Sequence, residues 1–159
     1  MSRLRLPDPE ATETLGRRLA QVLQPPLMIG LRGELGAGKT SLVRGLVNAL
    51  LPGTVVKSPT YGLVESYPMP GGGDLHHLDL YRLRDPAELE QLGLDDLVLP
   101  NALILIEWPE RGEPVLPARD LDLVLHHAGS ARELEFVPYS VAGAEIARAC
   151  ARSLDYLSC

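Results

Sequence analysis

The stretch Gly33-Glu34-Leu35-Gly36-Ala37-Gly38-Lys39-Thr40 decides how the rest of this sequence is interpreted. It matches the pattern G-x-x-x-x-G-K-[ST], in which glycines let phosphate groups approach backbone N–H groups closely. In this pattern the lysine supplies a cation to the β- and γ-phosphates, and the hydroxyl after it is a ligand for Mg²⁺. The stretch therefore predicts a P-loop that holds the phosphates of a nucleotide, with Lys39 and Thr40 as its reactive side chains.

The segments on either side of this loop support that interpretation, since the pattern alone can occur by chance in a glycine-rich turn. Leu27 to Leu31 is a short apolar run that is typical of a buried strand. From Lys39 to Leu50 apolar residues recur at helical spacing, and Pro52-Gly53 ends the helix. The positive end of that helix dipole would point at bound phosphates. Strand, loop and helix therefore follow one another in the order that the pattern requires.

Two acidic residues are candidates for the carboxylates that such a site needs near Mg²⁺ and the attacking water. Glu107 directly follows Ala102 to Ile106, a continuous apolar run that indicates a strand buried on both faces. Ligands bind at the carboxyl ends of strands in open α/β sheets, so we expect Glu107 beside the metal ion. Asp79 lies near the end of another predicted strand, Leu75 to Tyr81, and could reach the same ion. A solvated acid at a strand end is the alternative for each residue.

Two further residues are candidate members of the site. Thr60 lies in Ser58-Pro59-Thr60-Tyr61, at the place where many P-loop proteins have a mobile loop that senses the γ-phosphate. Its hydroxyl could bind the γ-phosphate, Mg²⁺ or a water molecule, although an ordinary turn has the same composition. Trp108, the only tryptophan, follows Glu107 and could either stack on a ligand or cover the end of the sheet.

The remaining segments alternate between helical and extended patterns. Further helices are predicted from Pro9 to Leu23, from Pro86 to about Gly93 and from Ser140 onward. Further strands are predicted at Val55 to Ser58, Gly62 to Tyr67, Leu121 to His126 and Glu133 to Val137. Neither a linker nor a repeat divides the chain. We therefore predict a single P-loop ATPase domain over residues 1–159, with a P-loop NTPase-like three-layer αβα sandwich and a mixed, mostly parallel central sheet.

Composition narrows the range of functions. The chain has 159 residues, of which 45% are hydrophobic, and this is enough for one core. Its net charge of −6 argues against binding RNA or DNA by phosphate neutralisation alone, so a partner would have to hold any nucleic acid. We find neither a signal peptide nor a segment that approaches the ~18 apolar residues of a membrane span. The expected location is the cytoplasm, without membrane contact.

Cysteines and histidines give no signal for a metal site or a disulfide. Cys150 and Cys159 have no partner at a metal-binding spacing. The pairs His76-His77 and His126-His127 lie in predicted strands, where neighbouring residues face opposite sides of the sheet. We interpret these histidines as structural or solvent-facing, and His77 is the only one near a candidate site residue.

Four pieces of the sequence together resemble the TsaE family, which is also called YjeE. They are the loop Gly33 to Thr40, Val56-Lys57-Ser58-Pro59-Thr60-Tyr61, His77-Leu78-Asp79-Leu80-Tyr81-Arg82-Leu83 and Leu105-Ile106-Glu107-Trp108-Pro109-Glu110. The loop alone is generic, but the other three pieces in this order and spacing are highly specific. The resemblance extends from about Pro7 to the last helix.

This resemblance implies a P-loop ATPase of bacterial threonylcarbamoyladenosine (t6A) synthesis. It would work with TsaD and TsaB and with threonylcarbamoyl-AMP made by TsaC, and would meet tRNA only through these partners. We expect it to be slow in isolation. The family's pattern would place ATP or ADP phosphates on Lys39 and on the backbone of Gly36, Ala37, Gly38, Thr40 and Ser41. Mg²⁺ would be bound by Thr40 and Glu107, Asp79 would be needed for hydrolysis, and Thr60 would lie in a switch-like loop.

Two other functions stay open at this point. A small-molecule kinase would need an acceptor pocket and an arginine-bearing lid, and Arg82 and Arg84 are candidates although no long insertion follows them. A non-catalytic nucleotide switch would change partner affinity without turnover, so it would keep its biological activity in a Glu107→Ala variant.

Overall fold

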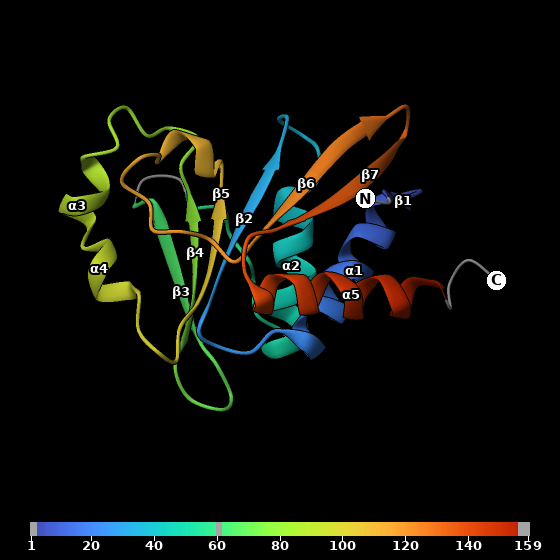
Figure 1. Cartoon of the computed structure of the whole chain (residues 1–159), viewed down its shortest axis with the longest axis horizontal. Helices are drawn as coiled ribbons and strands as arrows, with labels where there is room; N and C mark the ends of the chain where they lie inside the picture. Colours follow the sequence, from blue (N-terminus) through green and yellow to red (C-terminus); the bar gives the residue numbers. More distant parts are fainter. Residues whose placement is uncertain (1–2, 60–61, 156–159) are drawn as a thin grey trace.

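A seven-stranded sheet forms the centre of the computed structural model, which describes residues 3–59 and 62–155 (Figure 1). The strands lie in the order β1-β7-β6-β2-β5-β4-β3. Their bounds are β1 Leu4–Leu6, β2 Leu27–Gly33, β3 Val64–Pro68, β4 Asp74–Asp79, β5 Leu103–Glu107, β6 Leu121–Ala128 and β7 Ala131–Pro138. The helices are α1 Pro9–Val22, α2 Lys39–Leu50, α3 Glu88–Leu92, α4 Leu94–Leu97 and α5 Val141–Asp155, with a 3₁₀ turn at Pro109–Arg111.

The middle of the sheet is parallel. Strand β2 pairs in parallel with both β5 and β6, and β4 pairs in parallel with β5. The edges are antiparallel, because β3 pairs with β4, β7 with β6 and β1 with β7 in opposite directions. Only β3 and β7 therefore run against the other strands. This confirms the α/β fold and the mixed, mostly parallel sheet.

Helices cover the two faces of the sheet unequally. Helices α1, α2 and α5 lie on one face, whereas the short helices α3 and α4 cover the other face beside β4 and β5 (Figure 1). Each face of the sheet has its own hydrophobic core, because successive strand residues point to opposite faces. Ile29 and Leu105 pack with α1 and α2 in the first core, while Met28 and Ile104 pack with α3 and α4 in the second. The second core ends at β2, so β6 and β7 have no helix on that face.

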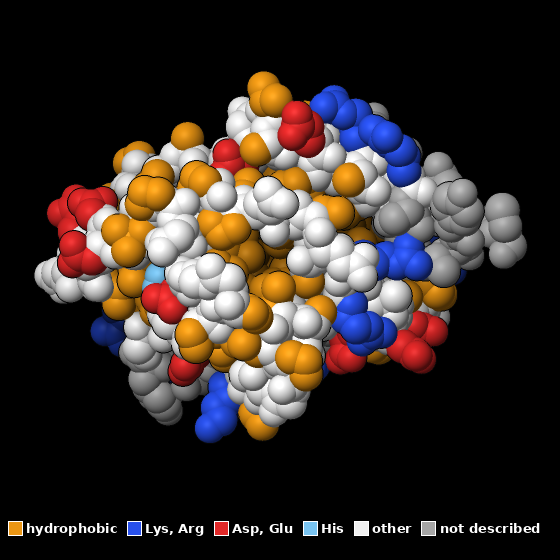
Figure 2. Space-filling view, turned by 90° about the horizontal axis from the view of Figure 1, so that it is seen from below, with side chains coloured by type: hydrophobic (Ala, Val, Ile, Leu, Met, Phe, Trp, Pro, Cys, Tyr) orange, Lys and Arg blue, Asp and Glu red, His pale blue; other side chains and the backbone are white. Residues whose placement is uncertain are grey.

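The end of the molecule opposite the glycine-rich loop is apolar near its centre. Figure 2 shows hydrophobic side chains gathered around a hollow there, with charged side chains toward the rim. A cavity of about 430 Å³ lies between Pro25-Pro26 and one side of α5. None of the helices within the described ranges is long and apolar enough to cross a bilayer.

Several predicted elements differ from the structure. The strand predicted at Val55 to Ser58 is wrong: these residues follow α2 without pairing to the sheet, and Val55 is 75% exposed. Strand β3 begins at Val64 instead of Gly62, because Leu63 has a positive φ of 62°. Strand β1 and helix α4 are not predicted from the sequence. Each has fewer than five residues, which is too short for a periodic pattern.

Candidate functional site

The glycine-rich loop joins the carboxyl end of β2 to the first turn of α2. Gly33 ends the strand with φ +148°, and a side chain there would press against the backbone oxygen of Leu125. Gly38 precedes the helix with φ +107°, in the left-handed region that other residues rarely adopt. These two glycines let the loop turn sharply and leave the backbone N–H groups at the start of α2 available to an anion.

Lys39 is the central cation of this loop. Its side chain is only 5% exposed, and Nζ donates to the backbone oxygens of Gly33 at 2.5 Å and Glu34 at 2.9 Å. Nζ also lies 4.3 Å from the centre of the Trp108 ring, within range of a cation–π interaction. Burial lowers the pKa of Lys39, and the nearby carboxylates of Glu107, Asp79 and Glu110 oppose this shift in smaller measure.

Thr40 and Glu107 approach each other across the loop. Glu107 is the last residue of β5 and is 2% exposed. The Thr40 hydroxyl donates to Oε1 of Glu107 at 3.3 Å and lies 3.5 Å from the Ser58 hydroxyl. Mg²⁺ prefers oxygen ligands and is commonly bound by one or two carboxylates together with substrate phosphates. The donor set of Thr40 and Glu107 fits such an ion.

Asp79 completes the acidic part of the site from the neighbouring strand. It is paired in register with Glu107, because β4 and β5 are parallel and end together. Its Oδ1 accepts a hydrogen bond from the backbone N–H of Tyr81 at 3.0 Å. Burial raises the pKa of Asp79, the charge of Glu107 adds to the shift, and the Tyr81 hydrogen bond, His77 and Lys39 oppose it.

His77 also contacts Glu107. It is fully buried, and its Nε2 lies 2.6 Å from Oε2 of Glu107. Of the two roles that the sequence suggests for this histidine, structural or solvent-facing, its complete burial excludes the second. Its spacing could have indicated the face of the sheet but not the contact itself: residues two apart in a strand share a face, so His77 lies on the same side as Asp79.

Trp108 forms the wall of the site beyond Glu107. Its backbone is left-handed, with φ +59° and ψ +50°, which a tryptophan seldom adopts. The ring lies 5.1 Å from the Tyr81 ring, and the Arg111 guanidinium lies over both rings at 4.9 and 5.3 Å. The strained turn therefore directs the indole toward Lys39 rather than away from the site.

These residues meet around a cavity of about 300 Å³. It is lined by Leu35, Gly36, Gly38, Lys39, Thr40, Ser41, Ser58, Asp79, Tyr81, Glu107 and Trp108. Of the predicted phosphate-binding residues, Gly33 and Ala37 are not among its lining: Gly33 ends β2 and Ala37 is buried. Thr60 lies outside the described residues. Three of the lining residues, Leu35, Ser58 and Tyr81, are not predicted as site residues, although Ser58 and Tyr81 lie within the motifs of the sequence.

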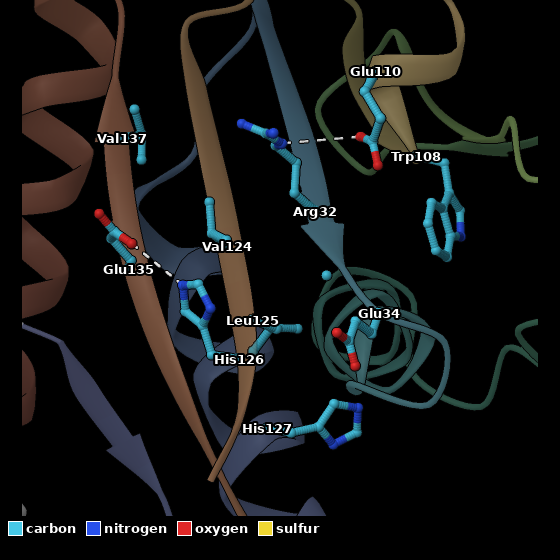
Figure 3. Close-up of a pocket in the computed structure, with 11 residues that line it drawn as sticks. Arg32, Glu34, Trp108, Glu110, Val124, Leu125, His126, His127, Glu135 and Val137 are labelled. Atoms are coloured by element: carbon cyan, nitrogen blue, oxygen red, sulfur yellow. Dashed lines mark hydrogen bonds and ion pairs between the residues drawn. The ribbon is translucent and has the colours of Figure 1, made fainter.

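A second, larger groove adjoins this cavity on the open face of the sheet. Figure 3 shows it between β2, β6 and β7. Trp108 lines both this groove and the cavity. Its volume is about 610 Å³. Arg32 lies 3.9 Å from Glu110 across it, and His126 lies 3.3 Å from Glu135. The groove exists because α3 and α4 do not extend over β6 and β7.

The described residues hold no cluster of three or more histidine, cysteine or acidic side chains that could bind a metal by themselves. A metal ion at Thr40 and Glu107 would therefore need oxygens from a ligand or water as well. This is the usual situation for Mg²⁺ in sites that bind nucleotides.

The fold and the site define an α/β protein in which a glycine-rich loop of the P-loop pattern joins a central parallel strand to a helix, beside acids from two neighbouring strands. The chain belongs to the TsaE family, since the model of the family "Threonylcarbamoyl adenosine biosynthesis protein TsaE" matches residues 6–134.

Relatives of this family resemble the chain over most of its length. A Haemophilus influenzae protein named tRNA threonylcarbamoyladenosine biosynthesis protein TsaE is 38% identical over 146 residues, which cover 89% of this chain and 92% of that protein. A Synechocystis protein of the same name is 45% identical over 122 residues, which cover 72% and 73% of the two chains. The crystal structure of Bacillus subtilis YdiB is 27% identical and covers 96% of this chain and 95% of its own, with a TM-score of 0.79.

Proposed function

We propose that this chain is a Mg²⁺-dependent ATPase that serves the t6A modification of tRNA in the cytoplasm. Its binding and hydrolysis of ATP would be coupled to turnover of a TsaD–TsaB complex. The names of its relatives support the pathway. The observation that carries the ATPase proposal is the convergence of Lys39, Thr40, Asp79 and Glu107 on one cavity at the mouth of the loop.

Phosphate binding would fall to the loop and the start of α2. The backbone N–H groups from Gly36 to Ser41 and the positive end of the α2 dipole would face the phosphate oxygens. Lys39 would exchange its contacts with the carbonyls of Gly33 and Glu34 for contacts with the β- and γ-phosphates. These two contacts would hold the cation at the loop before the nucleotide binds.

Hydrolysis would depend on position and charge rather than on a covalent intermediate. Thr40 and Glu107 would bind Mg²⁺, which supplies positive charge to the β- and γ-phosphate oxygens. Asp79, beside Glu107 at the strand ends, would orient a water molecule toward the γ-phosphorus. A P–O bond to that water forms while the bond to the ADP oxygen breaks, which yields ADP, phosphate and a released proton.

Partners would complete the activity. We propose that TsaD and TsaB bind this chain and that tRNA meets it only through them. The net charge of −6 supports an indirect contact with tRNA, because the chain as a whole would repel the phosphate backbone of tRNA. Hydrolysis by the isolated chain would be slow and would increase on addition of the TsaD–TsaB complex.

Comparing ATP hydrolysis by the wild type and two variants tests the enzymatic proposal. We expect Glu107→Ala to lower the rate about 100-fold or more, because several kcal/mol of charge stabilisation depend on the bound metal. Glu145→Gln removes an exposed acid on α5 and serves as the matched control, with an unchanged rate. Equal rates for wild type and Glu107→Ala would contradict an ATPase and favour a nucleotide-dependent binding switch.

A further inference from the structure

The proposed mechanism does not use the buried contact between the side chains of His77 and Glu107. His77 is fully buried in β4, and its Nε2 lies 2.6 Å from Oε2 of Glu107. Strand β4 is held in register against β5, with His77 opposite Leu105 and Asp79 opposite Glu107. The imidazole therefore reaches Glu107 diagonally across the ladder.

The second ring nitrogen shows which way the hydrogen bond runs. Nδ1 of His77 is the one buried side-chain nitrogen or oxygen in the described part of the chain that lacks a hydrogen-bond partner. A protonated Nδ1 would be a buried donor without an acceptor, which is unfavourable. The ring proton therefore belongs on Nε2, which donates to the Glu107 carboxylate.

Stability alone does not account for a histidine at this position. A buried polar atom without a partner lowers the stability of the fold, and an apolar side chain would fill the space without that penalty. The hydrogen bond to Glu107 is what His77 provides and an apolar side chain lacks.

The pairing also fixes one oxygen of the Glu107 carboxylate beside Thr40. Oε2 lies 2.6 Å from Nε2 of His77, while the Thr40 hydroxyl lies nearer to Oε1, at 3.3 Å, than to Oε2, at 3.5 Å. Thr40 and Glu107 are the residues assigned to Mg²⁺ above. A fixed Oε2 therefore holds Oε1 in the direction in which the two metal ligands would meet the ion.

We infer that His77 is a positioning residue for Mg²⁺: its Nε2–H holds the Glu107 carboxylate so that Oε1 and the Thr40 hydroxyl present a preformed pair of ligands. The inference rests on the proposed Mg²⁺-dependent nucleotide site. Hydrogen-bond partners of metal ligands typically contribute about 10–100-fold to metal affinity.

Three substitutions separate positioning from packing. His77→Leu removes the donor and fills the space. His77→Gln keeps an amide N–H at about the reach of Nε2, whereas His77→Asn keeps the amide on a side chain one carbon shorter. The affinity for a fluorescent ATP analogue is measured as Mg²⁺ is titrated, which gives the free Mg²⁺ concentration at half of the increase in affinity. The affinity for the analogue is also measured in EDTA.

We expect His77→Leu and His77→Asn to raise the half-saturating Mg²⁺ concentration about 10–100-fold, while His77→Gln stays near the wild type. Analogue binding in EDTA should be unchanged in all three variants, since the loop and Lys39 are intact. If His77→Leu fails to fold, the comparison of Gln with Asn still decides, because both carry an amide.

Two results would overturn the inference. One is an unchanged Mg²⁺ requirement in His77→Leu or, failing that variant, in His77→Asn. The other is an equal loss of analogue binding with and without Mg²⁺, which indicates a role in packing. A wild-type chain whose analogue binding does not respond to Mg²⁺ at all would instead refute the proposed function.

Discussion

At the scale of single residues, the site contains ionisable side chains that are partly or fully buried, and burial is unfavourable for their charged forms. Lys39, Asp79 and Glu107 lie within one small cavity, and burial shifts the pKa of Lys39 downward and that of Asp79 upward. Both shifts disfavour the charged forms that the proposed chemistry requires. Such opposition is common at functional sites, where activity is gained at the expense of stability.

Asp79→Asn should therefore stabilise the protein in EDTA and without nucleotide at pH 7, while hydrolysis is lost. The pKa of Asp79 is raised on folding, so its carboxyl favours the fold below the unfolded-state pKa of about 3.9, and this contribution is lost as pH rises through the folded-state pKa. The amide avoids that loss and can still accept the hydrogen bond from Tyr81. Thermal unfolding from pH 8 downward checks this.

The gain in melting temperature should shrink as pH falls through the folded-state pKa of Asp79. Asp74→Asn is the matched control, because Asp74 begins the same strand but is exposed. It should change the free energy of unfolding by less than about 0.5 kcal/mol. A destabilised Asp79→Asn variant would show that the carboxylate supports the fold.

Most of the residue-level site could be predicted, and the reason is geometric. Strand ends in a parallel sheet meet at one edge, so Asp79 and Glu107 were expected near the loop, and the structure places them there. The sequence does not show whether Trp108 faces the site or covers the end of the sheet, because this depends on the left-handed backbone at that residue. The His77 contact depends on the register of β4 against β5, which no local pattern specifies.

At the scale of elements, α1 and α2 form the support of the loop. They pack so closely that glycines replace side chains at the contact: Gly16 faces the backbone of Leu42, and Gly45 faces the backbone of Glu13. Helix α1 itself begins regularly, with Asp8 accepting a hydrogen bond from Ala11 N–H at 2.8 Å. The position of Lys39 at the start of α2 thus depends on a backbone-to-backbone contact.

Gly45→Ala should destabilise the protein by about 1–3 kcal/mol, because the added carbon would press on the carbonyl of Glu13, which cannot rotate away. In a solvent-exposed helix the same change would stabilise the protein by about 1 kcal/mol. The sign of the change in the free energy of unfolding therefore shows whether Gly45 is in close contact with α1. Denaturant unfolding measures the difference. Gly71→Ala in the β3–β4 turn should have little effect, because an added Cβ would have no atom within 4 Å beyond those of its chain neighbours. A stabilised Gly45→Ala variant would refute the close contact.

Long periodic helices and apolar strands could be predicted at this scale, whereas short and paired elements could not. The loop helix was expected from Lys39 to Leu50, and α2 has these bounds. Strand β1 has three residues and exists because it pairs with β7, which lies more than 120 residues later. Its formation is a tertiary effect that local sequence does not encode.

At the scale of the whole molecule, the sheet is covered on one face and half-covered on the other. The open half forms the groove beside Trp108, a residue that also lines the cavity at the glycine-rich loop. The net charge is −6, and carboxylates such as Glu110 and Glu135 line the groove. Neither feature offers a continuous basic surface to nucleic acid.

The isolated chain should therefore not bind tRNA at physiological salt. Cationic proteins bind nucleic acid non-specifically with dissociation constants of about 10⁻⁴–10⁻⁶ M, and an anionic chain should bind more weakly than this range. Fluorescence anisotropy of labelled tRNA, titrated to about 100 µM protein with and without TsaD and TsaB, checks the expectation. Micromolar binding by the chain alone, weakened by added salt, would contradict it.

The most direct test of the central proposal is multi-turnover formation of t6A on tRNA in a mixture of TsaD, TsaB and TsaC. Reactions contain wild-type chain, Glu107→Ala or no added chain, and ATP consumption is followed in parallel. The account predicts sustained turnover, accompanied by ATP hydrolysis, with the wild type alone. Equal turnover with Glu107→Ala would contradict coupling to hydrolysis, and equal turnover without the chain would contradict its role in the modification.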